Sequence, residues 1–259
     1  MSLSFDFAGS VVVVTGGGKG IGRGISEAFL AAGAVVVVCG RQAPPTLPAA
    51  AGRSAEFLPC DVRDAAAVAA FFEAVVAQHG RLDVLVNNAG GAPPHTAADV
   101  SARLAERIIQ LNLLGPLYCA QAAYRQMLQQ GSGAIINIAS VAGARPTPGS
   151  ATYGAAKAGL LNLSRSLAME WGPQVRVNAI VAGLMAADNL DEFYGGAAGV
   201  KRIDAMLPLG RMGKPEDIAA ACLYLASPMA AYVSGATLEV HGGGEPPAFL
   251  YLAGQPAPP

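Results

Sequence analysis

The chain has 259 residues, of which 53% are hydrophobic and 14% charged, so a large core can form and the composition argues against disorder. Its formal net charge is -1 and no cluster of Lys and Arg is present, so we expect neither a nucleic-acid partner nor a membrane surface. The four cysteines are scattered, and the N-terminus lacks the features of a signal peptide. We therefore expect a cytoplasmic protein whose cysteines are small buried hydrophobic residues.

Short, continuously apolar runs alternate with helical patterns along the chain. We expect strands at residues 11–15, 34–39, 56–61, 84–87, 134–139, 175–181 and 236–240. We expect helices at residues 21–32, 64–80, about 100–130, 150–171 and 217–227, the third of them kinked or broken at Gly115-Pro116. This alternation predicts an α/β fold: one Rossmann-like domain over residues 1–259, with a doubly wound parallel sheet and helices on both faces.

A glycine-rich turn, TGGGKGIG at residues 15–22, follows the first expected strand. It does not fit the G-x-G-x-x-G fingerprint from Gly16, because residue 21 is isoleucine; Gly16, Gly20 and Gly22 fit G-x-x-x-G-x-G instead. Glycines at such a turn let the backbone approach a pyrophosphate closely and point free N–H groups at it. Taken alone, the cluster could also be a purely structural turn.

Further motifs follow the glycine turn in a fixed order. They are CDV at 60–62, NNAG at 87–90, Asn112 in LNLLG, Ser140 in NIAS, YGAAK at 153–157, RVNAI at 176–180 and GRMGKPEDIA at 210–219. Through this series the chain resembles the short-chain dehydrogenases/reductases, from Thr15 to about Gly243. The resemblance implies reversible hydride transfer between C4 of a nicotinamide and a carbonyl carbon.

Tyr153 and Lys157 lie four residues apart in an expected helix and therefore share a face. An adjacent ammonium favours the phenolate and lowers the pKa of a tyrosine, although this spacing alone could be an exposed helix pair. The resemblance implies that Tyr153 transfers the proton, that Ser140 positions the carbonyl or hydroxyl, and that Lys157 holds the nicotinamide ribose. It also implies that Asn112 supports a water-mediated proton relay to Lys157; the alternative is that Asn112 caps the helix kink.

The cofactor is expected to be NADP(H) rather than NAD(H). An acidic residue after the second strand would bind the ribose 2′-hydroxyl and select NAD(H), but this chain has Gly40 and Arg41 there. A guanidinium can engage a 2′-phosphate bidentately, and Lys19 in the glycine turn could supply a second positive charge. Basic residues at these positions resemble NADP(H)-preferring members of the family. The alternative is that Arg41 is solvated and Lys19 only caps the turn.

The resemblance also implies which residues contact the cofactor. Asp61 and Val62 would meet the adenine ring, and residues 88–90 the adenosine ribose. The full expected set is Gly16, Gly18, Lys19, Gly20, Ile21, Gly22, Arg41, Asp61, Val62, Asn88, Ala89, Gly90, Tyr153, Lys157 and Gly183. No metal is expected, because His79, His95 and His241 are isolated.

Three positions depart from the family's usual pattern. Ala182 replaces the usual Pro, Ala187 stands where a Thr would help hold the carboxamide, and residues 241–244 read His-Gly-Gly-Gly where Asp-Gly-Gly is usual. We therefore expect the nicotinamide to be anchored through backbone groups. The changes leave the expected catalytic residues intact.

A substrate lid is expected over about residues 184–207 and a C-terminal tail over 244–259. The lid's mostly apolar residues favour a hydrophobic ketone or a 3-oxoacyl thioester, and Arg145 could meet an anionic group or be solvated. Alternatives are an NAD-linked alcohol or hydroxysteroid dehydrogenase, or an idle nucleotide-binding protein on the same fold. The resemblance also suggests a homo-oligomer, commonly a tetramer.

Overall fold

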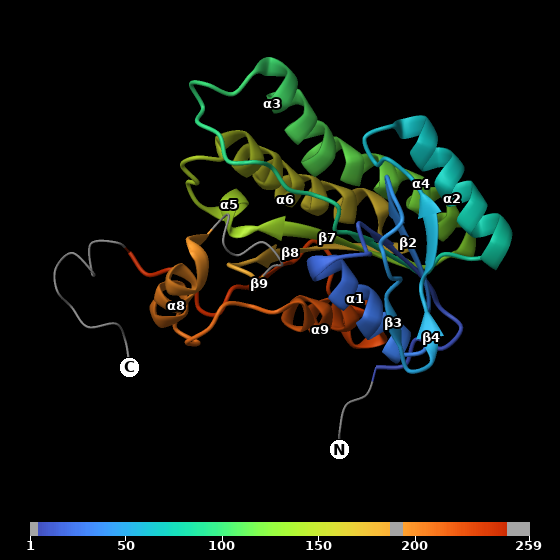
Figure 1. Ribbon diagram of the computed structural model, residues 1–259. Coiled ribbons are helices and arrows are strands. Elements are labelled where there is room, and N and C mark those ends of the chain that lie inside the picture. Colours follow the sequence, from blue (N-terminus) through green and yellow to red (C-terminus); the bar gives the residue numbers. More distant parts are fainter. Residues whose placement is uncertain (1–4, 187–193, 248–259) are drawn as a thin grey trace.

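The computed structural model describes residues 5–186 and 194–247 and contains a seven-stranded parallel sheet in the order β5-β2-β1-β6-β7-β8-β9 (Figure 1). The strands are β1 (Val11–Thr15), β2 (Val35–Gly40), β5 (Glu56–Pro59), β6 (Val84–Asn87), β7 (Gly133–Ser140), β8 (Val175–Ala182) and β9 (Thr237–Val240). The chain starts at β1, runs outward to β5, and then continues on the other side of β1 from β6 to β9. The order therefore reverses between β1 and β6, where doubly wound sheets bind their ligands.

Helices cover both faces of the sheet, as expected for strands that are apolar on both sides. They are α1 (Gly20–Ala31), α2 (Ala65–His79), α3 (Ala102–Ile109), α4 (Gly115–Gln130), α5 (Val141–Ala144), α6 (Ala151–Trp171), α8 (Gly196–Met206) and α9 (Pro215–Ala226). Helices α1 and α9 lie on one face, and α2, α4 and α6 on the other (Figure 1). Within β1, Val12 and Val14 face the first layer, whereas Val11 and Val13 face the second. The predicted fold is confirmed.

Several local elements differ from the prediction. The surface segment around residues 43–52 leads into a small hairpin of β3 (Ala49–Ala50) and β4 (Arg53–Ser54), whose two-residue strands are too short to show a period. The four-residue α5 was missed for the same reason. Helix α9 begins at Pro215 instead of Asp217, because proline is favoured in the first turn, where its missing N–H is not needed.

The interruption expected at Gly115-Pro116 is a π-helical turn, η1 (Gln110–Leu114), that joins α3 to α4. The wider turn ends just before Gly115, so Pro116 falls in the first turn of α4. A Cβ on Gly115 would lie 3.0 Å from the carbonyl oxygen of Val62, so the missing side chain lets α4 approach the loop that follows β5.

Parts of the expected lid and tail lie outside the described residues: 187–193, with Ala187, Leu190 and Phe193, and 248–259. The described remainder of the lid contains α8, which the sequence did not predict. The single-domain assignment over residues 1–259 stays a prediction. None of the helices in residues 5–186 and 194–247 is both long and apolar enough to cross a bilayer.

Candidate active site

The glycine turn connects the end of β1 to the start of α1. Gly16 and Gly20 adopt left-handed backbone conformations, with φ of 64° and 49°, which side chains disfavour. A Cβ on Gly22 would lie 2.3 Å from the Gly16 carbonyl oxygen and 2.5 Å from Nδ2 of Asn88. Lys19, at the helix start, makes no capping side-chain bond in the described structure, so the first N–H groups of α1 stay available to an anion.

Thr15 ties the glycine turn to the neighbouring strand β6. Its Oγ1 accepts hydrogen bonds from the backbone N–H groups of Asn88 and Ala89, both at 3.0 Å. Nδ2 of Asn88 in turn donates to the Thr15 carbonyl oxygen at 3.0 Å. These bonds span the point where the strand order reverses. No role was predicted for Thr15, whose only signal in the sequence is a hydroxyl group at the end of an apolar strand.

The residues that follow β2 and β5 form a corner of the site that carries positively and negatively charged side chains. Arg63 Nε donates to Oδ1 of Asp61 at 2.9 Å, and this bond holds the pKa of Asp61 below its usual value; the charge of Arg41 adds to the effect. Arg41 and Lys19 are both exposed. A Cβ on Gly18 would lie 3.0 Å from Pro44, so the glycine turn reaches the segment after Arg41. The structure therefore brings these predicted residues to one corner, and adds Arg63.

Ser140, Tyr153 and Lys157 come together beyond the carboxyl end of β7. Ser140 ends β7, and its Oγ accepts from the backbone N–H of Ala142 at 3.2 Å, which caps α5. Tyr153 and Lys157 share a face of α6, with the Lys157 Nζ 5.7 Å from the Tyr153 ring centre. Nζ donates to the Ile138 carbonyl oxygen at 2.8 Å, two strand positions before Ser140.

Burial shifts both titrating groups of this cluster. It raises the pKa of Tyr153, and a hydrogen bond with Ser140 only partly offsets this. Burial also lowers the pKa of Lys157 to about 8, because the ammonium is removed from water. The expected lowering of the Tyr153 pKa is therefore not found in the protein without cofactor, because desolvation of the phenolate outweighs the hydrogen bond with Ser140 that stabilises it.

Asn112 is fully buried in the π turn and holds the loop after β6. Its Nδ2 donates to the carbonyl oxygens of Gly91 and Ile108, both at 2.9 Å, and its Oδ1 accepts from the Gly91 N–H at 2.8 Å. The bond to Ile108 satisfies a carbonyl of the widened turn, which fits the kink-capping alternative. A Cβ on Gly90 would lie 2.8 Å from Asn112 Oδ1 and 3.2 Å from Lys157 Nζ. Asn112 and Lys157 thus converge on Gly90.

A buried chain of polar side chains supports the cluster from below. Asn87 Nδ2 donates to Asn137 Oδ1 at 2.9 Å and to the Pro116 carbonyl oxygen at 3.1 Å, and Asn137 Nδ2 donates to Ser164 Oγ at 2.9 Å. These bonds join β6, β7, α4 and α6 at one depth in the sheet, and so fix the helix that carries Tyr153. No role was predicted for Asn137 and Ser164, although an amide side chain inside an apolar strand indicates a buried hydrogen-bond partner.

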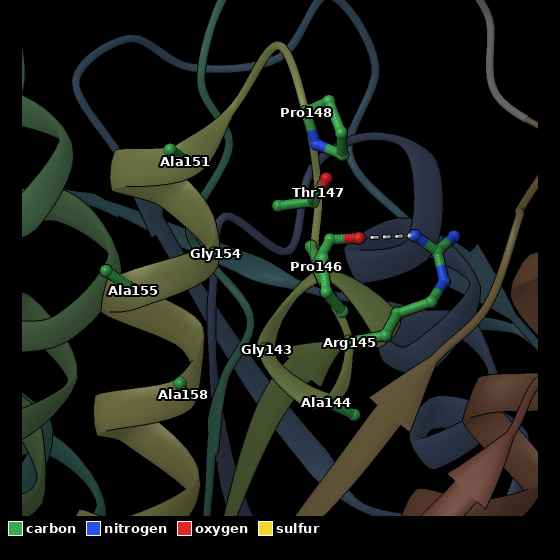
Figure 2. A pocket seen from close by; sticks show the side chains of 11 residues that line it. Gly143, Ala144, Arg145, Pro146, Thr147, Pro148, Ala151, Gly154, Ala155 and Ala158 are labelled. Atoms are coloured by element: carbon green, nitrogen blue, oxygen red, sulfur yellow. Dashed lines mark hydrogen bonds between the residues drawn. The ribbon is translucent and has the colours of Figure 1, made fainter. Parts of the chain in front are cut away.

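The substrate-side rim is formed by α5, the end of β8 and the segment after β9. A Cβ on Gly183 would lie 2.6 Å from the Cα of His241, so only glycine lets these chains pass. Arg145 follows α5 and forms an ion pair with Glu245. A hollow of about 510 Å³ between α5 and α6 (Figure 2) is lined by small residues together with Arg145, Pro146 and Pro148; Ser140, Tyr153 and Lys157 do not line it.

The three histidines lie apart from this cluster or pair with carboxylates. His79 lies 3.3 Å from Glu56, and His241 lies 2.8 Å from Glu239. Within the described ranges, no group of three or more His, Cys, Asp or Glu side chains could hold a metal ion.

A doubly wound sheet with a glycine turn at its reversal point and a Ser-Tyr-Lys cluster beside it defines a Rossmann-type oxidoreductase. The family model described as Enoyl-(Acyl carrier protein) reductase matches residues 16–245. The chain is 37% identical to a D-threitol dehydrogenase of Mycolicibacterium smegmatis, over 94% of this chain and 96% of that protein. It is also 37% identical to a 3-oxoacyl-(acyl-carrier-protein) reductase of Chlamydia muridarum, over 89% and 95% of the two chains.

Among solved structures, a short-chain alcohol dehydrogenase from Sinorhizobium meliloti superposes with a TM-score of 0.84 and 37% identity, over 97% of this chain and 99% of that one. The chain belongs to the short-chain dehydrogenase/reductase family. It is therefore an oxidoreductase of a family that uses a nicotinamide cofactor.

Proposed function

We propose that the protein is an NADP(H)-dependent reductase of a carbonyl group on a hydrophobic substrate, with 3-oxoacyl thioesters among the candidates. The observation that carries this proposal is the convergence of Ser140, Tyr153 and Lys157 at the carboxyl end of β7. A proton donor, an orienting hydroxyl and a buried ammonium are what a ketone needs when it accepts a hydride. The intact cluster argues against an idle nucleotide-binding protein.

The residues present fit a dinucleotide. Gly16 and Gly22 let the turn fold closely against itself and residues 88–89, and Gly20 has open space where a side chain would lie, so a pyrophosphate could reach the free N–H groups of α1. Asp61 and Val62 would contact the adenine, residues 88–90 and Lys157 the two riboses, and Gly183 the nicotinamide end. The bound nicotinamide supplies the hydride.

In the proposed reaction Tyr153 donates its hydroxyl proton to the carbonyl oxygen as the carbonyl carbon is reduced. The Ser140 hydroxyl donates a hydrogen bond to the same oxygen and so holds it beside Tyr153. Lys157, whose pKa of about 8 lies close to neutrality, can then return a proton toward the phenolate. Asn112 keeps the Gly90–Gly91 backbone against Lys157 and so positions the relay. In the oxidative direction each proton moves the opposite way.

The preference for NADP(H) rests on the charges at the adenosine corner. Arg41 and Lys19 are exposed there, and Arg63 already neutralises Asp61, the nearby acidic residue. A 2′-phosphate would therefore meet two exposed cations and little electrostatic repulsion from Asp61.

Titration of the protein with NADPH and with NADH tests this preference. We expect NADPH to bind more tightly than NADH. In Arg41→Ala the ratio of the two affinities should fall by about tenfold, because one charge-assisted contact to the 2′-phosphate is lost. Arg53→Ala is the matched control, because Arg53 is an exposed arginine on the neighbouring hairpin. Equal affinities for the two cofactors in the unaltered protein would contradict the assignment.

A second candidate is an NAD-linked dehydrogenase that oxidises an alcohol, including a hydroxysteroid. The similarity to a D-threitol dehydrogenase favours it. A panel of ketones, thioesters and alcohols, followed through NADPH oxidation or NAD+ reduction, separates the two candidates by substrate and by direction.

We also propose that the chain assembles as a homotetramer, as the family resemblance suggests. The support is a sheet edge at β9 and well-exposed apolar side chains at Met169 on α6 and at Tyr232 before β9.

A further inference from the structure

The rim of the candidate active site contains an ion pair between two segments that are far apart in sequence. Arg145 donates from Nε to Oε2 of Glu245 at 2.7 Å and from Nη2 to Oε1 of the same carboxylate, across 100 residues of chain. Its Nη1 donates to the Pro146 carbonyl oxygen at 3.2 Å. The two-pronged edge of the guanidinium, with which an arginine binds a carboxylate, is therefore already used.

Arg145 is held in a fixed relation to the catalytic cluster. It follows α5, which Ser140 caps, and its N–H donates to the Val141 carbonyl oxygen at 3.0 Å. A Cβ on Gly143 would lie 2.7 Å from the carbonyl carbon of Lys157, so the α5 turn sits directly on the α6 turn that carries Lys157. Figure 2 shows the Arg145 side chain turned away from the small residues of α6.

Glu245 is held by the turn that follows β9. Gly242, Gly243 and Gly244 all have positive φ, of 67°, 95° and 79°, so the three together bend the chain back toward α5. The Leu209 N–H donates to the Gly242 carbonyl oxygen at 3.2 Å, which ties this turn to the segment after α8. The His-Gly-Gly-Gly sequence, which replaces the family's usual Asp-Gly-Gly, thus forms a turn that places the Glu245 carboxylate at Arg145.

The pair also lies close to the catalytic tyrosine. The negative charge of Glu245 adds to burial in raising the pKa of Tyr194, and Tyr194 contributes in the same way to the raised pKa of Tyr153. The geometry agrees, because Arg145 ends the short helix α5 that Ser140 caps and that packs on Lys157, which places the ion pair beside the catalytic cluster. The Glu245 side chain is 18% exposed and that of Arg145 43%, so solvent screens the pair only in part.

We propose that Glu245 is a specificity-determining residue that selects neutral ketones against ketones carrying an anionic group. Arg145 is the cation placed to bind a substrate carboxylate or phosphate near the reacting carbonyl, and Glu245 occupies it. An anionic substrate must displace Glu245 and leave that carboxylate half-buried without its partner. This inference rests on the proposed carbonyl reductase function and narrows its substrate class.

The test compares a ketone ester with its own acid, methyl 4-oxocyclohexanecarboxylate and 4-oxocyclohexanecarboxylate, at saturating NADPH. We expect the unaltered protein to prefer the ester. In Glu245→Gln and Glu245→Ala, the ratio of kcat/KM for ester over acid should fall by about tenfold or more, because a freed guanidinium binds the carboxylate. Adding Arg145→Gln should restore the original ratio. Glu239→Gln, which removes an exposed glutamate of the same segment, should leave the ratio unchanged.

An unchanged ratio in both Glu245 variants, or a fall that persists without Arg145, would overturn the inference. Failure of the proposed function gives a different result: no variant oxidises NADPH with the ester. Calorimetric titration of the NADP+-saturated protein with cyclohexanecarboxylate does not depend on turnover. There the Glu245 variants should bind the acid about tenfold more tightly than the unaltered protein; equal affinities would again overturn the inference.

Discussion

The two sides of the candidate site are held together differently. On the cofactor side, Gly16, Gly22, Thr15 and Asn88 interlock through backbone atoms and short side chains in the turns at the ends of β1 and β6. On the substrate side, the closing contact is a partly exposed ion pair between Arg145 and Glu245. On the cofactor side, a methyl group added at Gly16 or Gly22 would press against backbone atoms, whereas the substrate side depends on two charged side chains that can each be replaced alone. We infer that the reaction is set by packing and the substrate range by replaceable surface contacts.

Tyr153→Phe tests the part of the site that both sides share, and has the largest expected effect. Removing one hydroxyl takes away the proton donor while the ring still fills its place. We expect kcat to fall by about a thousandfold, the usual contribution of a positioned general acid. The dissociation constant for NADPH, measured by fluorescence titration, should barely change. Tyr232→Phe, a fully exposed tyrosine, is the control. Substantial turnover in Tyr153→Phe would refute the assigned role.

Gly22→Ala tests the packed cofactor side. The added methyl would lie 2.3 Å from the Gly16 carbonyl oxygen, and because that neighbour is backbone, the turn itself must move. We expect the dissociation constant for NADPH to rise by about ten- to a hundredfold, as overpacking costs typically imply.

Gly80→Ala is the matched control for this change. Gly80 ends α2 with a φ of 74° and open space around its Cα. Alanine there should reduce the free energy of unfolding by about 1 kcal/mol and leave NADPH binding unchanged. If Gly22→Ala, like Gly80→Ala, lowers the free energy of unfolding but leaves the affinity for NADPH unchanged, the turn does not bind the cofactor.

The sheet was predictable because its central strands β1, β2 and β6 are short, buried and apolar on both faces, and because helix-length segments separate most of the strands. The same rule failed where elements are too short for a period, as in α5 and the β3–β4 hairpin. The break near Gly115-Pro116 was expected, but its form as a π turn was not, since that depends on Asn112 bonding to Ile108 in the folded chain.

The site was predictable to the extent that its residues lie in local motifs. Ser140, Tyr153 and Lys157 were identified in this way, and the structure brings them together. Arg63 was missed because its importance lies in one bond, to Asp61. Glu245 was missed because nothing near it in sequence points to Arg145; the contact exists only once β9 and α5 share one end of the sheet.

Lys157 tests whether the packed side extends beneath the catalytic cluster. Burial lowers its pKa to about 8 from a usual value near 10.5. From about pH 8 to pH 10, the unfolded chain therefore keeps a proton that the folded protein releases, so stability rises with pH in this window. Below it the lysine is protonated in both states. Tyr153, whose pKa is raised, opposes the gain only above about pH 10.

Over that window we expect the protein without added cofactor to gain about 2 kcal/mol in the free energy of unfolding relative to Lys157→Met, as measured by denaturant titration. Lys201→Met, at an exposed lysine, should instead follow the unaltered protein. If the Lys157→Met curve stayed parallel to that of the unaltered protein, the ammonium would be hydrated in the folded state. Lys157 would then belong to the solvent-accessible substrate side, and the contrast between a packed cofactor side and a replaceable substrate side would not hold at Lys157.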